Sequence, residues 1–285
     1  MGYSLDNSTS TTIVYSTSVS ASVSTSLGSH TLHVKSWGNQ GASCVTDVPI
    51  TVVAGPKPET IPSNAISVYG IQKLNYYWQG IQDDATGNGI ASGSMSMTSW
   101  PTMSGYTRKF VTSYRNSAGE RFWTSFGADT SAHNFVYDVE VYVDSTASDI
   151  ANIEMDMNQV IANGQTIIYG FQCDGYTNTW DYTRNAGSPG YPVDEWVHSS
   201  APCNPQNWVK NTWHHIQIAY SRDDSGNVTY KYLIFDGVQK NLNETVPSAF
   251  ALGWGSTLLT NFQVDGLGGY GTANVYVDKM FVSRW

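Results

Sequence analysis

Charge is scarce in this sequence: only 13% of its 285 residues are Asp, Glu, Lys or Arg, and the net charge is −9. Phosphate binding needs clustered Lys and Arg, so this composition excludes a nucleic-acid-binding protein. No apolar run reaches the roughly 18 residues of a membrane span. The first residues, Met1–Asp6, lack the basic and apolar regions of a signal peptide, so we expect a piece of a longer protein.

Cysteine is equally rare, with three in the chain. Cys173 and Cys203 bracket a segment rich in Gly, Pro and Asn, which reads as an irregular loop. A disulfide would restrict the large conformational freedom of such a loop. We therefore predict a Cys173–Cys203 disulfide and, with it, an oxidising, extracellular location. Cys44 is left over, either as a free buried thiol or as the former partner of a segment outside this sequence.

Common catalytic signatures are absent: the sequence contains no G-x-S-x-G, no P-loop and no C-x-x-C. Aromatic residues, in contrast, are abundant, with ten Trp and eighteen Tyr. We expect most of these rings in the core, although exposed rings are what sugar-binding surfaces use. A polar, weakly charged, aromatic-rich composition is typical of secreted β proteins.

A proline-rich linker, predicted at residues 55–62, divides the chain into two parts. Residues 1–54 read as short strands, among them Ser29–Trp37, and residues 63–285 hold many strands and few helices. The clearest strands of the second part are Phe135–Val143, Thr166–Gln172, Trp213–Tyr220, Val228–Phe235 and Val275–Val282. Turn signals such as Asp236-Gly237 separate them. This organisation predicts an all-β protein whose main domain is a jelly-roll β-sandwich.

One strand combines an apolar face with a chemically rich one. In the run 152–159, Ile153, Met155 and Met157 alternate with Glu154, Asp156 and Asn158. Successive side chains of a strand point to opposite faces, so two carboxylates and an amide share one face. That face is either a sugar or metal site or a hydrated sheet surface.

Several segments resemble the concanavalin A-like lectin and glucanase superfamily. They are the W-H-x-I run at Trp213–Ile216, the D-G turn after Phe235, and the closing strand 275–282. Segments 135–143 and 154–159, with Gln172-Cys173, also resemble secreted domains of soil bacteria that carry E-F-D-x-N-Q. The run Leu27–Trp37 resembles the penultimate strand of bacterial immunoglobulin-like repeats. These resemblances imply a secreted bacterial protein with a partial immunoglobulin-like module before a concanavalin A-like domain.

The run Glu154–Gln159 is similar to the E-x-D-x-x-E strand of glycoside hydrolase family 16. The resemblance assigns the nucleophile to Glu154 and the assisting carboxylate to Asp156. Gln159 takes the place of the acid/base, and an amide cannot do that work. The family mechanism therefore cannot be transferred intact.

Three readings of this face remain beside an unliganded hydrated surface. A lectin-like domain would bind sugar hydroxyls through Glu154, Asp156, Asn158 and Gln172. A retaining glycoside hydrolase would take its acid from elsewhere, with Glu140 on a neighbouring strand as the first candidate and Asp194-Glu195 as another. A structural Ca²⁺ would be held by Glu154 and Asp156 with Asn163 and Asp174, or separately by Asp83, Asp84 and Asn88.

Trp180 and Trp196 lie in the segment between the two cysteines, where an irregular loop would leave them little core to join. We predict them as stacking platforms for sugar rings. The sequence thus favours a monomeric, extracellular protein that recognises a polysaccharide. Glycan hydrolysis is the alternative, and an adhesive or structural surface protein is a third class.

Overall fold

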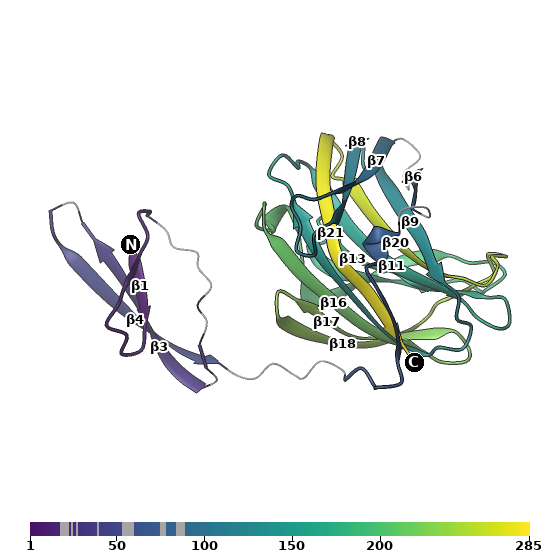
Figure 1. Ribbon diagram of the computed structural model, residues 1–285, viewed down its shortest axis with the longest axis horizontal. Coiled ribbons are helices and arrows are strands. Elements are labelled where there is room, and N and C mark those ends of the chain that lie inside the picture. The colour runs from purple at the N-terminus through teal and green to yellow at the C-terminus, as the bar shows by residue number, and fades with distance from the viewer. Residues whose placement is uncertain are drawn as a thin grey trace. The chain divides into compact units, whose positions relative to one another are not determined.

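The computed structural model describes the chain except residues 18–22, 24, 27, 39, 53–59, 75–77 and 84–88. The chain forms two compact units, Met1–Pro58 and Glu59–Trp285, here called the N-terminal unit and the sandwich unit (Figure 1). Most of the predicted linker falls outside the described residues. No described helix is long and apolar enough to cross a membrane.

The N-terminal unit contains one four-stranded antiparallel sheet in the order β2-β1-β3-β4. Its strands are β1 (Gly2–Leu5), β2 (Thr12–Ile13), β3 (Gly28–Trp37) and β4 (Ser43–Val52). The Asp6 carboxylate ties the end of β1 to β3, because it accepts hydrogen bonds from the Thr31 amide and from the His30 ring. Cys44 is free and exposed on β4. The immunoglobulin-like character of this unit stays a prediction.

The sandwich unit consists of two large antiparallel sheets and two short 3-10 helices, which confirms the predicted all-β sandwich. One sheet has eight strands in the order β18-β17-β16-β10-β21-β8-β7, with β5 beside β21. The other has nine strands in the order β15-β14-β13-β11-β20-β9-β6, with β12 beside β11 and β19 beside β12. Strands distant in sequence are thus neighbours, as β11 and β20 show.

The elements of the sandwich unit are β5 (Ile66–Tyr69), η1 (Ile71–Lys73), β6 (Gln79–Asp83), β7 (Ile90–Thr98), β8 (Thr107–Arg115), β9 (Gly119–Gly127), β10 (Asn134–Val143), β11 (Ile150–Val160), β12 (Thr166–Tyr169), β13 (Phe171–Asp174), β14 (Thr179–Asn185), β15 (Asp194–Pro202), η2 (Pro205–Asn207), β16 (Trp213–Arg222), β17 (Asn227–Phe235), β18 (Val238–Pro247), β19 (Ala249–Phe250), β20 (Leu258–Gly266) and β21 (Tyr270–Arg284).

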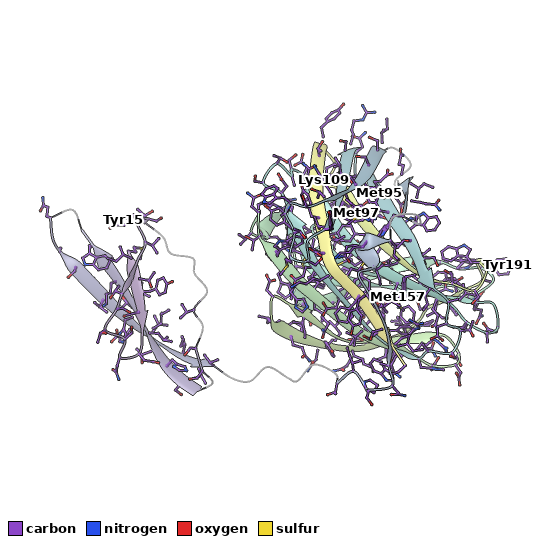
Figure 2. All side chains as sticks on the ribbon, viewed as in Figure 1. Tyr15, Met95, Met97, Lys109, Met157 and Tyr191 are labelled. Atoms are coloured by element: carbon purple, nitrogen blue, oxygen red, sulfur yellow. A yellow bond between two sulfur atoms is a disulfide. The ribbon has the colours of Figure 1, made fainter. Side chains whose placement is uncertain are left out.

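The core lies between the two sheets and is built from one face of each strand. On β11 the apolar residues Ile153, Met155 and Met157 are buried there; Met157 lies among the packed side chains in Figure 2. Phe110 stacks on Phe262 from the opposite sheet, with ring centroids 5.2 Å apart. Because these side chains face inward, their polar neighbours in the sequence must face outward.

Four of the five predicted strands of the sandwich unit occur where the pattern placed them, as β10, β16, β17 and β21, and so does the Asp236-Gly237 turn. Asp236 and Gly237 both have positive φ, 48° and 78°, as a two-residue hairpin turn between β17 and β18 requires. The predicted strand 166–172 is divided, since Gly170 separates β12 from β13. A Cβ on Gly170 would lie 2.5 Å from the Thr183 side chain, so the backbones approach closely here.

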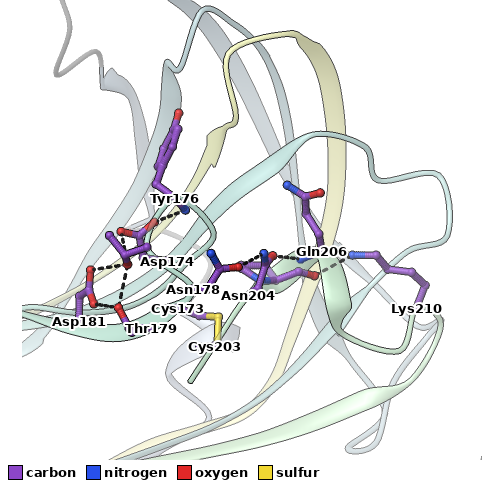
Figure 3. Close-up of a disulfide and its surroundings, with 12 residues drawn as sticks. Cys173, Asp174, Tyr176, Asn178, Thr179, Asp181, Cys203, Asn204, Gln206 and Lys210 are labelled. Carbon is purple, nitrogen blue, oxygen red and sulfur yellow. Dashed lines mark hydrogen bonds between the residues drawn. A yellow bond between two sulfur atoms is a disulfide. The ribbon is translucent and has the colours of Figure 1, made fainter. Parts of the chain in front are cut away.

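The segment between the cysteines is a β-hairpin rather than an irregular loop, which corrects that expectation. β14 pairs with β13 on one side and with β15 on the other. The predicted Cys173–Cys203 disulfide is confirmed, with the two Cα atoms 5.4 Å apart (Figure 3). Asn204 beside it caps η2 by accepting a hydrogen bond from the Gln206 amide, 2.9 Å. The disulfide therefore fixes the far end of the hairpin to the sheet.

Candidate functional site

Polar side chains form a continuous row across the outer face of the nine-stranded sheet. Glu154 on β11 lies directly opposite Gln172 on β13 and, on its other side, opposite Gln263 on β20. Read from β15 to β9, the row is His198, Asp181, Gln172, Glu154, Gln263 and Arg121. Directly opposed side chains in a sheet lie close enough to interact, so the row forms one connected surface.

A second row of side chains lies beside the first on the same face, two residues away along each strand. Asn152 on β11 lies opposite Asp174 on β13 and opposite Asp265 on β20. Asp265 is in turn opposite Gly119. A Cβ built on Gly119 would lie 1.7 Å from the Asp265 carboxylate. The Asp265 side chain can therefore occupy this position only because residue 119 is glycine.

The central parts of these rows form the floor of a cleft of about 770 Å³, whereas His198, Asp181 and Gly119 lie outside its lining. Its walls carry apolar and aromatic side chains from the β15 edge and from the loop after β19. Trp254 and Tyr176 are 43% and 49% exposed, and Trp196 is half-buried. The lining residues are Asp83, Ser117, Arg121, Asn152, Glu154, Asp156, Asn158, Ile168, Gln172, Asp174, Tyr176, Thr183, Pro192, Asp194, Trp196, Phe250, Leu252, Trp254, Asn261, Gln263 and Asp265.

Glu154 and Asp156 are two residues apart on one face of β11, and both line the floor of the cleft. Burial, followed by the neighbouring Asp156 charge, raises the pKa of Glu154 well above its ordinary value. Burial also raises the pKa of Asp156, but this carboxyl accepts hydrogen bonds from the Phe171 amide, 3.1 Å, and from Asn261, 3.4 Å. The pKa values of both carboxyls are therefore raised, that of Glu154 more than that of Asp156.

Two further carboxyls of the cleft, those of Asp265 and Asp194, have raised pKa values. Burial raises the pKa of Asp265 to about 7, against the hydrogen bonds that it accepts from Gln263. Asp194 is exposed at the rim, yet the surrounding walls desolvate it and, with the Asp156 charge, raise its pKa to about 6. Near neutral pH the cleft thus contains both protonated and ionised carboxyls.

The structure brings most of the predicted ligand-binding residues together. Glu154, Asp156, Asn158 and Gln172 share the floor, and Trp196 stands in the wall. Their position in one cleft agrees with the pattern that selected them, and their role in binding stays a prediction. Glu195 faces away from the cleft and pairs with Arg184, 2.8 Å.

The prediction of Trp180 as a stacking platform is wrong. Its side chain is only 2% exposed and stacks on Phe171 in the core, with ring centroids 5.3 Å apart. The reason is the hairpin: on β14, Trp180 and Tyr182 face inward, whereas Asp181 and Thr183 face the outer side. A regular strand buries every second residue, which an irregular loop does not.

The prediction of Glu140 as an acid for Glu154 is also wrong. Glu140 lies on β10, a central strand of the eight-stranded sheet, whereas Glu154 lies on the other sheet. Its core-facing neighbours, Val139 and Val141, are fully buried, so Glu140 points out of the opposite side of the sandwich. The entire core separates the two carboxyls.

Gln159 does not reach the cleft. The register of β11 against β20 runs unbroken from Asn152 to Gln159, so alternation places Gln159 on the inner face. Its amide donates to the backbone carbonyls of residues 129 and 132 and accepts from Tyr169 and Arg222, each 2.9 Å. A carboxyl at position 159 would therefore lie inside the sandwich as well.

The predicted calcium sets are not assembled as proposed. Asn163 is exposed on the turn after β11 and bonds to Gln165, outside the cleft that Asp174 lines. Of the second set, Asp83 lines the cleft, while Asp84 and Asn88 lie outside the described residues. A calcium ion shared by the first four residues is therefore not supported.

A different group could offer metal ligands. Among the described residues, Asp174, Asp181 and His198 place ligand atoms within 4.8 Å of one another. These carboxylates already have partners: Asp174 accepts from the Tyr176 amide, 2.6 Å, and Asp181 accepts from Thr179, 2.6 Å (Figure 3). Asp181 also bonds to the His198 ring, 2.8 Å. Their donors and acceptors are matched without an ion.

Several residues of the floor and one of the wall were not predicted from the sequence. Asn261, Gln263 and Asp265 on β20 alternate with buried residues just as the 152–158 run does, and the same pattern would have found them. Trp254 lies between two glycines, a position that signals an exposed ring. Arg121 carried no recognisable signal.

Comparison of the sequence with protein-family models gives no match, and neither does comparison with curated proteins. Solved structures with a similar fold include a family 11 carbohydrate-binding module from Clostridium thermocellum, in complex with a β-1,3-1,4-mixed-linked tetrasaccharide (11% identity, 76% of this chain and 94% of the module covered, TM-score 0.34). Another is arcelin-5, a lectin-like defence protein from Phaseolus vulgaris (13%, 73% and 99%, 0.37). A third is an endo-1,3-β-glucanase from Streptomyces sioyaensis (12%, 81% and 99%, 0.35).

Proposed function

We propose that this protein recognises a polysaccharide and holds a short stretch of its chain in the cleft. The observation that carries the proposal is the combination of a polar, acceptor-rich floor with aromatic walls in one cavity of about 770 Å³. That size falls within the range of about 300–1,000 Å³ that is usual for ligand sites.

The chemistry of floor and wall suits the two faces of a sugar ring. Hydroxyl groups donate hydrogen bonds to carboxylate and amide oxygens, which Asp156, Asn158 and Gln172 supply. The C–H face of a pyranose loses apolar contact with water when it stacks on an indole, which Trp196 and Trp254 offer. A ligand with both kinds of surface fits this cleft better than a purely apolar one.

Glycan hydrolysis is the second candidate, and Asp194 favours it. A carboxyl whose pKa is raised to about 6 is suited to general acid catalysis near neutrality, and Asp194 lines the same cleft as Asp156. The pKa of Glu154, predicted as the nucleophile, is raised well above its ordinary value, and a protonated carboxyl is poorly suited to that role. The resemblance to the E-x-D strand of family 16 supports this candidate only through Glu154 and Asp156.

We also propose that the protein works outside the cell, as an extracellular bacterial protein and a monomer. The Cys173–Cys203 disulfide supports an oxidising location. The N-terminal unit would be an immunoglobulin-like spacer, predicted as residues 1–54, followed by a linker at 55–62 and the binding domain at 63–285.

Affinity electrophoresis through gels containing a panel of neutral, acidic and amino-sugar polysaccharides tests the proposal. We expect at least one polymer to retard the protein, and Trp196→Ala and Trp254→Ala each to weaken that binding at least tenfold. Trp100→Ala is the matched control, because Trp100 is 70% exposed and does not line the cleft.

No retardation by any polymer, or equal loss in the Trp100 variant, would overturn the proposal. Reducing ends are assayed in the same samples. Their accumulation, and its loss in Glu154→Gln or Asp194→Asn, would replace recognition by hydrolysis as the function.

A further inference from the structure

The cleft has a strong excess of acidic side chains. Six carboxyl side chains line it: Asp83, Glu154, Asp156, Asp174, Asp194 and Asp265. Among the described lining residues, Arg121 is the one Lys or Arg, and its guanidinium lies 3.5 Å from Asp83. Neutral sugars need hydrogen-bond acceptors but no such accumulation of acidic side chains.

An acceptor at the centre of this floor is left without a donor. Gln263 is only 7% exposed, and its Nε2 donates to both oxygens of Asp265, at 3.0 and 3.2 Å. Its Oε1 is buried and has no hydrogen-bond partner among the residues that the structure describes. Buried acceptors are normally satisfied, so this atom calls for a donor from a ligand.

The carboxyls surround this acceptor. Glu154 lies directly opposite Gln263 across the β11–β20 pair, and Asp265 is two residues along β20 on the same face. A group placed over Gln263 would thus meet a carbonyl oxygen and carboxyls on two sides. An ammonium group offers three N–H donors and a positive charge to such a site.

On the basis of the proposed function, we propose that the ligand is an amino-sugar polysaccharide whose amino groups are free, so that each bound ring brings an ammonium to the floor. Uronate or sulfate groups would be repelled by the same carboxyls, and N-acetyl groups would lack the charge. The acidic floor thus selects the cationic polymer, while the aromatic walls bind the ring itself.

The experiment compares each polymer with its own chemically altered form. Soluble polyglucosamine and polygalactosamine are tested before and after complete N-acetylation, together with the neutral and acidic polymers of the panel. Binding is measured by titration calorimetry at physiological salt with a chelator present. We expect a free-amine polymer to bind at least tenfold more tightly than its acetylated form and than any neutral or acidic polymer.

Matched variants separate a site from general attraction between an acidic protein and a polycation. Asp265→Asn should lower the affinity for the free-amine polymer at least tenfold. Asp224→Asn, which removes the same charge from a side chain that is 95% exposed and outside the cleft, should lower it less than twofold. Trp196→Ala should also weaken binding.

Equal effects of the two Asp variants, or insensitivity to Trp196→Ala, would overturn the amino-sugar proposal. Tighter binding of a neutral or acidic polymer, including one that needs added Ca²⁺, would overturn it as well and leave polysaccharide recognition intact. If no polymer binds, with or without amines, both proposals fail.

Discussion

Asp265 illustrates how a single residue can link the cleft to stability. Its carboxyl is buried, and its pKa is raised to about 7 from an ordinary 3.8. The folded state therefore binds this proton more tightly than the unfolded chain does. The resulting contribution to stability is fully present below about pH 4 and is lost as the pH rises through 7.

We expect Asp265→Asn to stabilise the protein at pH 8 and to leave it nearly unchanged at pH 4. The amide cannot ionise, so the cost of a buried charge at high pH disappears; the gain should be on the order of 2–4 kcal/mol in the free energy of unfolding. Urea denaturation at both pH values measures it.

Asp224→Asn, at an exposed position, is the control for that measurement and should shift neither value noticeably. Equal stability of Asp265→Asn and the parent protein at pH 8 would contradict the assignment. It would mean that the Asp265 carboxyl is ionised in the folded protein at little cost.

At the scale of elements, the hairpin β14–β15 holds one edge of the cleft. β15 is the edge strand of its sheet and carries Trp196, and the Cys173–Cys203 bond ties its end covalently to β13 inside the sheet. An edge strand has hydrogen-bonded neighbours on one side alone, so it frays more easily than a central strand.

The double variant Cys173→Ser/Cys203→Ser should lose about 3–4 kcal/mol of unfolding free energy, because the disulfide closes a loop with a separation of 30 residues in the unfolded chain. Urea denaturation of the oxidised parent and the variant checks this. Cys44→Ser is the matched control and should have no effect, since Cys44 is free and exposed. A loss below about 1 kcal/mol would show that the bond adds little to the fold.

The elements also show what the sequence could predict. Alternation within one strand is local, so it correctly placed Glu154, Asp156 and Asn158 on one face. Which strands are neighbours depends on contacts between distant segments, which a local pattern does not encode. The assignment of Glu140 failed for that reason, since β10 and β11 are consecutive in sequence but belong to different sheets.

The environments of Trp180 and Trp196 likewise depended on strand pairing that a local sequence pattern does not encode. Whether the segment 174–202 was a loop or a hairpin decided the environment of its rings, and the Gly and Pro content favoured a loop. Pairing with β13 made it regular, which buried Trp180 and kept Trp196 on the cleft side. Trp254, in a Gly-rich loop between β19 and β20, was readable from the sequence by the reasoning applied to Trp196.

At the scale of the whole molecule, both the core and the cleft belong to the sandwich unit. The main core cluster is built from residues 71–282, and the cleft is lined by described residues between Asp83 and Asp265. The N-terminal unit has its own sheet and contributes none of these described side chains. A unit with its own core is able in principle to fold alone.

We therefore expect residues 59–285, expressed without the N-terminal unit, to fold and to bind the same polysaccharide as the full chain. The free energy of unfolding of the sandwich unit should change by less than about 0.5 kcal/mol, because the removed residues are remote from its core. The affinity for the polysaccharide should change by less than twofold. Denaturation followed by tryptophan fluorescence and the same gel assay measure the two quantities. A tenfold loss of affinity with an unchanged midpoint would instead make the N-terminal unit part of the binding surface.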